Sequence, residues 1–440
     1  MIYYFINRLK KILPFVLFFI FFLSINSEPW KINIFQDQTT IKDHFNYFRG
    51  ILPIISGFLI LGYLILDKKI FERLDIIAIV FFLYFLLQLS GLLINFPINQ
   101  EDNFNYRIYF LLLLLFSIFL FLYIKKNYLN KILLSMIILI LLINLYFVTV
   151  STYEFFTNKL PFYYLKIFQL NTTIFDSPTI RSTGLARINL VLFIFALIYL
   201  EKIKNNYFTL LVIVNLLLII LLQSRLNIYS FYLFLIFYLL FFKNFKTKER
   251  IKFFIIFSCV PLLIYHSIKF DKSESTLELN LNEEIKINIE NNVIFNKEKH
   301  RTFQNFSTGR SVIWKDLLNR PKTLKQIAFG FGTQADRILT TPSFFSASNA
   351  YVYIFICSGI LGVTVIISFI CYILVRIIKL IFVNKIFSKN GNIFLKFSIL
   401  IFIYLLFRSL VESSFSIYSI DYLFFVISSK IILLNKFLGR

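Results

Sequence analysis

The chain has 440 residues, 58% of them hydrophobic, and its mean hydropathy is +0.76. A soluble domain cannot bury that much apolar surface, so the composition excludes a soluble protein. The formal net charge of +23 suggests a nucleic-acid partner, but the lysines cluster in alternate short connectors between apolar segments. Because this is the positive-inside pattern, we predict an all-α polytopic integral membrane protein with no nucleic-acid partner.

About twelve membrane spans are predicted, since many apolar segments approach the roughly 20 residues that a bilayer requires. Their ranges are 12–27, 50–66, 76–95, 108–124, 132–150, 186–200, 208–223, 226–242, 253–268, 350–375, 393–411 and 417–435. The first resembles a signal peptide, but no small-residue cleavage site follows it, so we interpret it as a span. The lysine-rich connectors and both termini then share one side, which predicts cytoplasmic termini.

The predicted spans divide the chain into four regions. Residues 1–175 hold spans one to five, and residues 176–268 hold spans six to nine, with arginines near their outer ends. A large periplasmic loop at 269–349 lies between spans nine and ten, and the last three spans occupy 350–440. Because this loop is too long to be a mere connector, we expect it to have a functional role and to cap a cavity.

The large loop has two predicted parts. Within residues 271–299 two short runs, 277–281 and 285–289, alternate leucine or isoleucine with polar residues, which predicts a small β-hairpin. After Ser307, apolar residues on one face predict a short helix that ends near Pro321 and either lies along the membrane surface or caps the bundle. Residues 329–332 read Phe-Gly-Phe-Gly, which predicts a flexible turn whose backbone can approach a ligand.

Four sequence pieces are expected on the side of the large loop, and the first three carry an arginine each. They are Arg181-Ser-Thr-Gly184, Gln223-Ser-Arg225, Ser307-Thr-Gly-Arg310-Ser-Val-Ile-Trp314 with the Phe-Gly-Phe-Gly turn, and Ser348-Asn349-Ala-Tyr351 with Ser358-Gly-Ile-Leu-Gly362. Arg408 lies near the end of a late span on the same side. An arginine near hydrocarbon costs a few kcal/mol and is usually retained for a partner. Because guanidinium groups bind phosphate in a fork, we predict a site for a lipid-linked phosphate or diphosphate.

The order of these pieces resembles the bacterial O-antigen ligase and O-antigen polymerase superfamily. Its members typically show an Arg-x-x-Gly segment, a Ser-Arg pair, a Gly-Arg-x-x-x-Trp segment and a His-Asn pair leading into a helix. The resemblance covers roughly residues 175–435. It implies a metal-independent, inverting-type glycosyltransferase of the bacterial inner membrane that uses no cofactor. The implied donor is an oligosaccharide on undecaprenyl diphosphate, and the implied partners are a glycan or lipid A–core acceptor, membrane lipids and a chain-length regulator.

The resemblance also assigns roles to individual residues. Arg225 and Arg310 match the arginines thought to hold the diphosphate, where they would stabilise the charge on the leaving group. The further substrate-binding candidates are Arg181, Trp314, Asn349 and Arg408. The sequence contains neither a nucleotide-binding glycine-rich loop nor an Asp-x-Asp metal motif, which fits a lipid-linked donor. The three cysteines lie in apolar segments and predict buried thiols rather than a metal site.

The chain departs from the ligases at Ser348, where they carry the histidine proposed as general base or acceptor-orienting group. A serine hydroxyl is not a base near neutral pH without its own activator. Since polymerases of the superfamily often lack that histidine, the departure favours a polymerase. Arg408 and Glu412 are spaced i,i+4, which predicts an ion pair on one helix face. That pair is either structural, or Glu412 is a base or orients an arginine; Asp336 is a second candidate acid, or a solvated loop charge.

Three functions remain open from the sequence. The first is polymerisation of a surface polysaccharide, and the second is ligation of the finished chain to lipid A–core or, as in protein O-oligosaccharyltransferases, to protein. The third is a flippase or other transporter of lipid-linked glycans. A transporter is expected to keep charges near the membrane midplane and to show repeat symmetry. Here the arginines gather at one surface beside a long loop, which favours an enzyme.

Overall fold

The computed structural model describes ten stretches of the chain, together with scattered residues from 51 to 62 and residue 415. The stretches are 75–95, 104–123, 126–157, 182–202, 206–221, 225–241, 310–339, 347–382, 391–413 and 420–435. Every regular element in these stretches is a helix. The predicted first and ninth spans, the predicted β-hairpin and Arg181 lie outside the described residues.

Nine of the predicted spans correspond to helices. These are α3 (Ile76–Ile94), α4 (Phe104–Tyr123), α5 (Lys126–Thr157), α6 (Ser182–Lys202), α7 (Asn206–Leu221), α8 (Arg225–Phe241), α14 (Ala350–Phe382), α15 (Ile393–Ser409) and α16 (Ile420–Leu434). Within the described stretches, α3, α14 and residues Tyr128–Leu145 of α5 are long and apolar enough to cross a membrane. The all-helical class is therefore confirmed for these stretches, whereas the number of twelve spans stays a prediction.

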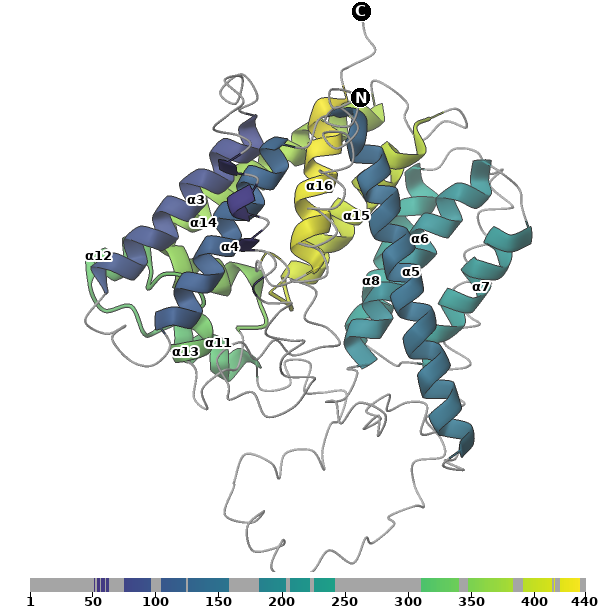
Figure 1. Ribbon diagram of the computed structural model, residues 1–440, viewed down its shortest axis with the longest axis horizontal. Helices are drawn as coiled ribbons and strands as arrows, with labels where there is room; N and C mark the ends of the chain where they lie inside the picture. Colours follow the sequence, from purple (N-terminus) through teal and green to yellow (C-terminus); the bar gives the residue numbers. More distant parts are fainter. Residues whose placement is uncertain are drawn as a thin grey trace, which may run out of the picture.

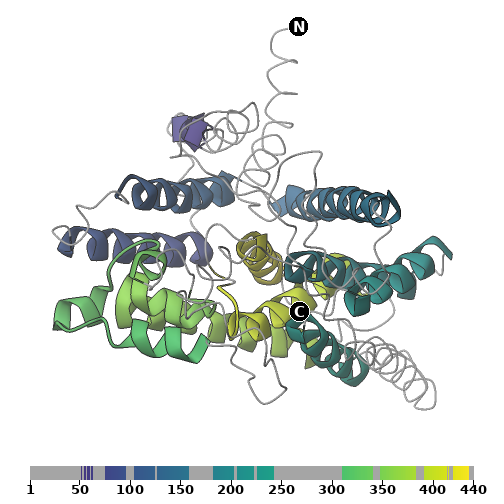
Figure 2. The same cartoon turned by 90° about the horizontal axis from the view of Figure 1, so that it is seen from below.

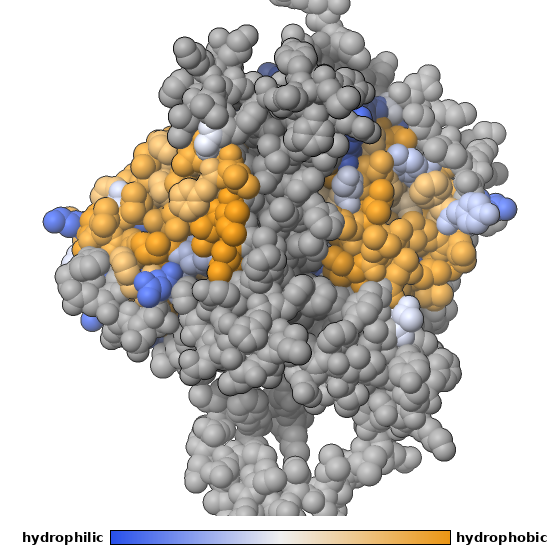
Figure 3. All heavy atoms as spheres, in the orientation of Figure 1, coloured by the Kyte–Doolittle hydropathy of each residue, from blue (hydrophilic) through white to orange (hydrophobic). Residues whose placement is uncertain are grey.

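The outer faces of these helices are apolar. Figure 3 shows hydrophobic surface at the left and at the right of the face in view. Exposed large side chains lie on α3, α5, α7, α8 and α14, for example Ile79, Leu142, Leu210, Ile236 and Val375. Water-soluble monomers rarely expose contiguous apolar patches of this kind, whereas lipid covers them at no cost. The surface is therefore that of a membrane protein.

Two groups of helices pack on either side of a central pair. In Figures 1 and 2, α3, α4 and α14 lie on one side, α5 to α8 on the other, and α15 and α16 between them. The central pair forms the core, since every residue of α16 from Ile420 to Ile432 is buried. Aromatic rings fill the space around it: Phe425 stacks on Phe402 and meets Phe369 edge to face.

Polar contacts tie the helix ends into two sets. Asp75, which caps the start of α3, pairs with Lys430 near the end of α16 at 3.1 Å. Lys430 also donates to the carbonyl of Phe121, near the end of α4. At the opposite end, Arg408 near the end of α15 meets Asp421 at the start of α16. In each of the pairs α3–α4 and α15–α16, the two helices therefore run in opposite directions, as expected for consecutive spans. We call the end of the bundle with Lys430 the lysine end and the end with Arg408 the arginine end.

Three short helices from the predicted loop pack at the arginine end. They are α11 (Arg310–Leu318), α12 (Leu324–Phe329) and α13 (Ala335–Leu339). The prediction of a short helix before Pro321 is confirmed by α11. The Thr323 and Gln326 side chains form a capping box that starts α12, which packs against α3 and α14. This part of the loop is thus built into the bundle.

The predicted flexible turn at Phe329–Gly332 is wrong, because this turn is buried against other backbone. The α14 helix breaks at Gly359, whose φ of 64° lies in the left-handed region. The break frees helix carbonyls, and the N–H of Phe331 donates to Ile356 at 2.8 Å. A Cβ at Gly332 would lie 2.7 Å from the backbone nitrogen of Leu92. Glycine here permits close packing of this turn against α3 and α14.

Candidate functional site

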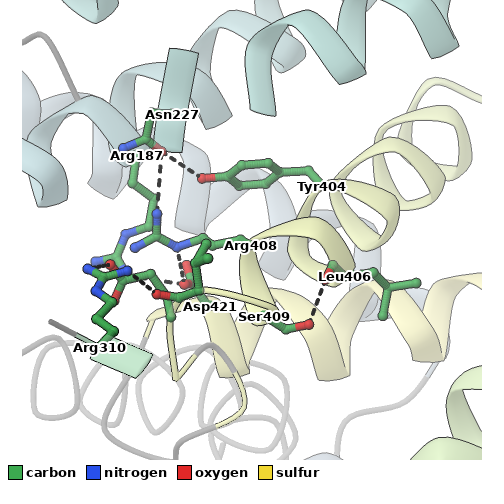
Figure 4. Close-up of polar contacts among 10 residues, drawn as sticks. Arg187, Asn227, Arg310, Tyr404, Leu406, Arg408, Ser409 and Asp421 are labelled. Carbon is green, nitrogen blue, oxygen red and sulfur yellow. Dashed lines mark hydrogen bonds and ion pairs between the residues drawn. The ribbon is translucent and has the colours of Figure 1, made fainter. Parts of the chain in front are cut away.

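Two buried arginines share one carboxylate at the arginine end. Arg408 Nε lies 2.7 Å from Asp421 Oδ2, and Arg187 Nη1 lies 3.3 Å from the same oxygen. The two arginine side chains are 4% exposed and that of Asp421 is 3% exposed. Because an unpaired buried charge is costly, Asp421 is what makes the burial of both guanidinium groups tolerable. Among the described residues, this cluster therefore holds two guanidinium groups and one carboxylate (Figure 4).

Asn227 fixes the orientation of Arg408. Its Oδ1 accepts hydrogen bonds from Arg408 Nη1 at 3.3 Å and from the Tyr404 hydroxyl at 3.2 Å. Asn227 is in the first turn of α8, which begins at Arg225. The backbone of Arg225 is therefore at the arginine end as predicted, and its side chain lies outside what the structure describes.

Arg310 reaches the same end from α11. Its Nη2 lies 3.1 Å from Glu412 Oε1, and its Nη1 donates to the carbonyl of Val411. Val411 and Glu412 follow Arg408 by three and four residues, so Arg310 docks on the end of the helix that carries Arg408 (Figure 4). A cation at a helix C-terminus is favoured by the helix dipole. The side chains of Arg310 and Glu412 are 31% and 25% exposed, which leaves this pair accessible.

The predicted ion pair between Arg408 and Glu412 is wrong. Arg408 pairs with Asp421, and Glu412 pairs with Arg310. The regular helix ends at Ser409, so Glu412 lies in the turn after α15 and leaves the face that carries Arg408. The structure thus brings Arg310, Arg408 and Glu412 to one end, through partners that local spacing does not predict.

Trp314 and Asn349 hold the loop rather than an open site. Trp314 Nε1 donates to the carbonyl of Ala347 at 2.6 Å. The Asn349 side chain donates to the carbonyl of Leu410 at 2.8 Å, and its oxygen caps the start of α14. Leu410 precedes Val411, so Asn349 and Arg310 hold consecutive carbonyls. Asn349 therefore positions the turn that follows α15, and Trp314 contacts the segment that leads into α14.

Asp336 is buried rather than solvated, so the interpretation as a solvated loop charge is wrong. Its Oδ2 accepts a hydrogen bond from the backbone of Ala347 at 2.9 Å. Burial raises the pKa of the Asp336 carboxyl above its ordinary range, although Arg337 acts in the opposite direction. Asp336 thus holds the backbone of Ala347, the residue before Ser348. Ser348 itself has a positive φ of 47°.

A small apolar pocket lies between α8 and α15 beside the arginines. It is lined by Ser230, Phe234, Phe237, Leu400, Ile403, Tyr404 and Phe407. Tyr404 belongs both to this pocket and to the network around Asn227, and Phe407 is next to Arg408. Apolar surface and positive charge are therefore adjacent at this end of the bundle.

Sequence reasoning missed Arg187, Asn227, Tyr404 and Asp421. The motif predicted a role for Arg181, whereas the structure shows Arg187, six residues later, in contact with Asp421. An available signal was the occurrence of Arg187 and Asp421 inside predicted spans, since charges in spans usually pair with one another.

No group of three or more His, Cys, Asp or Glu side chains within the described stretches could hold a metal ion. No protein-family model matches the chain, and no curated protein is significantly similar to it.

Proposed function

We propose that the chain is a membrane glycosyltransferase of surface polysaccharide assembly, with an oligosaccharide on undecaprenyl diphosphate as donor. The observation that carries this proposal is the meeting of Arg187, Arg310 and Arg408 with two carboxylates at one end of the bundle. Three guanidinium groups and two carboxylates make the described part of this cluster net positive, and Arg225 begins a helix at the same end. A diphosphate is the anion that this positive charge suits.

The proposed reaction is attack by an acceptor hydroxyl on the anomeric carbon of the donor. The bond from that carbon to the diphosphate oxygen breaks, the acceptor proton is released, and undecaprenyl diphosphate leaves with the electron pair. Negative charge therefore grows on the diphosphate in the transition state. Guanidinium groups that are already fixed stabilise this charge more than that of the ground state. The bonds of Arg408 to Asp421 and Asn227 supply that fixed orientation.

The position of the arginines favours transfer from a lipid over the rival functions. The described arginine cluster is at one end of the bundle rather than at its middle, which favours a transferase over a transporter. Ser348 in place of the ligase histidine favours polymerisation, and ligation to lipid A–core or protein is the second candidate function.

The test is a null strain complemented with the wild type, Arg225→Ala or Arg310→Ala at matched expression. Removing one group that stabilises the leaving charge is expected to lower transfer about 100-fold. On a gel of surface polysaccharide, a polymerase then gives a ladder with the wild type and a single repeat unit with the variants. Long chains retained on undecaprenyl diphosphate would instead identify a ligase.

A matched control is Arg320→Ala in the same loop, where Arg320 forms an exposed ion pair with Asp316 at 3.1 Å. This variant is expected to give the wild-type ladder, because exposed pairs contribute little to stability. An unchanged pattern in both Arg225→Ala and Arg310→Ala would contradict the proposed binding of diphosphate by the arginines.

A further inference from the structure

We infer that Glu412 is an exchangeable counter-ion, which leaves Arg310 when the diphosphate binds and returns when the product leaves. This inference rests on the proposed function and assigns Glu412 a part in setting the affinity of that site. It differs from the roles of general base and arginine-orienting group, because here the carboxylate competes with the ligand for the same guanidinium.

The two acidic residues of the site are held differently. Asp421 is buried and receives two guanidinium groups on one oxygen, at 2.7 and 3.3 Å. Glu412 is 25% exposed, and its carboxylate contacts one guanidinium, that of Arg310, at 3.1 Å. Removing Asp421 from its arginines would take away the described counter-charge of two buried guanidinium groups, whereas a partly exposed ion pair separates at lower cost. Asp421 is therefore the fixed anion and Glu412 the exchangeable one.

Arg310 keeps its place without Glu412. Its Nη1 donates to the carbonyl of Val411, and it is the first residue of α11. The contact with Glu412 uses the other terminal nitrogen, Nη2. Because a guanidinium group has five N–H donors in a fixed fork, Nη2 can exchange a carboxylate partner for a phosphate while Nη1 stays bound. Because the Arg310 side chain is 31% exposed, a ligand can reach its guanidinium group.

The exchange needs only a movement of the Glu412 side chain. The backbone N–H of Glu412 bonds to the carbonyl of Arg408 at 2.9 Å, and Asn349 holds the carbonyl of Leu410. The turn after α15 is thus anchored on both sides. With the carboxylate in place Arg310 is neutralised, so the same side chain that competes with the donor also favours release of undecaprenyl diphosphate.

The test measures binding of inorganic diphosphate, and of farnesyl diphosphate, to the purified full chain in lipid nanodiscs by calorimetry at low salt. Glu412→Gln removes the competing charge at equal size and is expected to tighten binding about fivefold, as an exposed ion pair permits. Arg310→Gln is expected to weaken binding, and the double variant to bind like Arg310→Gln, because the two residues act on one contact. Asp316→Asn, in the exposed pair with Arg320, is the control with unchanged affinity.

The outcomes separate the counter-ion role of Glu412 from the proposed function. Equal or weaker binding by Glu412→Gln and Glu412→Ala, with binding still lost in Arg310→Gln, overturns the counter-ion and leaves the proposed function standing. Absence of diphosphate binding by the wild type, or no effect of Arg310→Gln, overturns the proposed function and this inference with it. Thermal unfolding of each variant separates loss of binding from loss of folding.

Discussion

Asp421 is expected to be the most sensitive single position at the arginine end. At an effective dielectric constant of about 20, its separations of 2.7 and 3.3 Å from Arg408 and Arg187 correspond to gross attractions of about 6 and about 5 kcal/mol. Asp421→Asn removes both and leaves two guanidinium groups, each 4% exposed, facing a neutral amide. Because part of the attraction offsets desolvation, the expected net loss of unfolding free energy is about 3–5 kcal/mol.

The assay is unfolding of the purified chain by a denaturing detergent, followed by the loss of helical circular dichroism. Glu412→Gln is the matched comparison, since it neutralises a carboxylate of the neighbouring, partly exposed pair and is expected to cost at most about 1 kcal/mol. A second variant, Asp421→Glu, keeps the charge and is expected to recover part of the loss. A stability of Asp421→Asn within about 1 kcal/mol of the wild type would refute the reasoning that this carboxylate compensates two buried charges.

Two further predictions concern the packing around the loop helices. Gly359→Ala is expected to reduce the yield and thermal stability of the folded chain, since Gly359 has a φ of 64° and an added Cβ would clash with the carbonyl of Ala328. Gly62→Ala is the tolerated control, because a Cβ at Gly62 would have no neighbouring atom within 4 Å. Equal stability of the two variants would contradict the argument that close backbone packing requires glycine at 359. For Asp336, burial raises the pKa in the folded chain, so the stability it contributes is complete below the ordinary aspartate pKa and is lost as the pH rises through the raised value. Thermal midpoints measured from acid to neutral pH should fall more steeply for the wild type than for Asp336→Asn, and parallel curves would count against this explanation.

Hydropathy predicted the helical class of the described stretches, whereas the orientation inferred from charge asymmetry stays a prediction. Nine predicted spans coincide with helices because an apolar run of membrane length must satisfy its backbone hydrogen bonds internally, as a helix does. The α11 helix was also predicted, since its apolar residues recur at helical spacing. These features depend on local sequence, which is why they are accessible without a structure.

The partners of the arginines were not accessible in the same way. The i,i+4 spacing predicted an ion pair between Arg408 and Glu412. Because α15 ends at Ser409 and α16 packs against it, Arg408 pairs with Asp421 instead. Likewise, glycine at 332 permits a close approach but does not say to what, and the approach is to α3. Pairing between distant helices is decided by tertiary packing, which one sequence does not contain.

The central claim is that the arginine end transfers a glycan from undecaprenyl diphosphate. Its most direct measurement incubates the purified chain in liposomes with undecaprenyl-diphosphate-linked oligosaccharide and analyses the lipid and glycan products by mass spectrometry. The account predicts that the wild type releases undecaprenyl diphosphate and forms longer glycans, and that Arg310→Ala does so about 100-fold more slowly. A wild type that leaves the donor chemically intact, whether or not it moves it across the bilayer, would contradict the account.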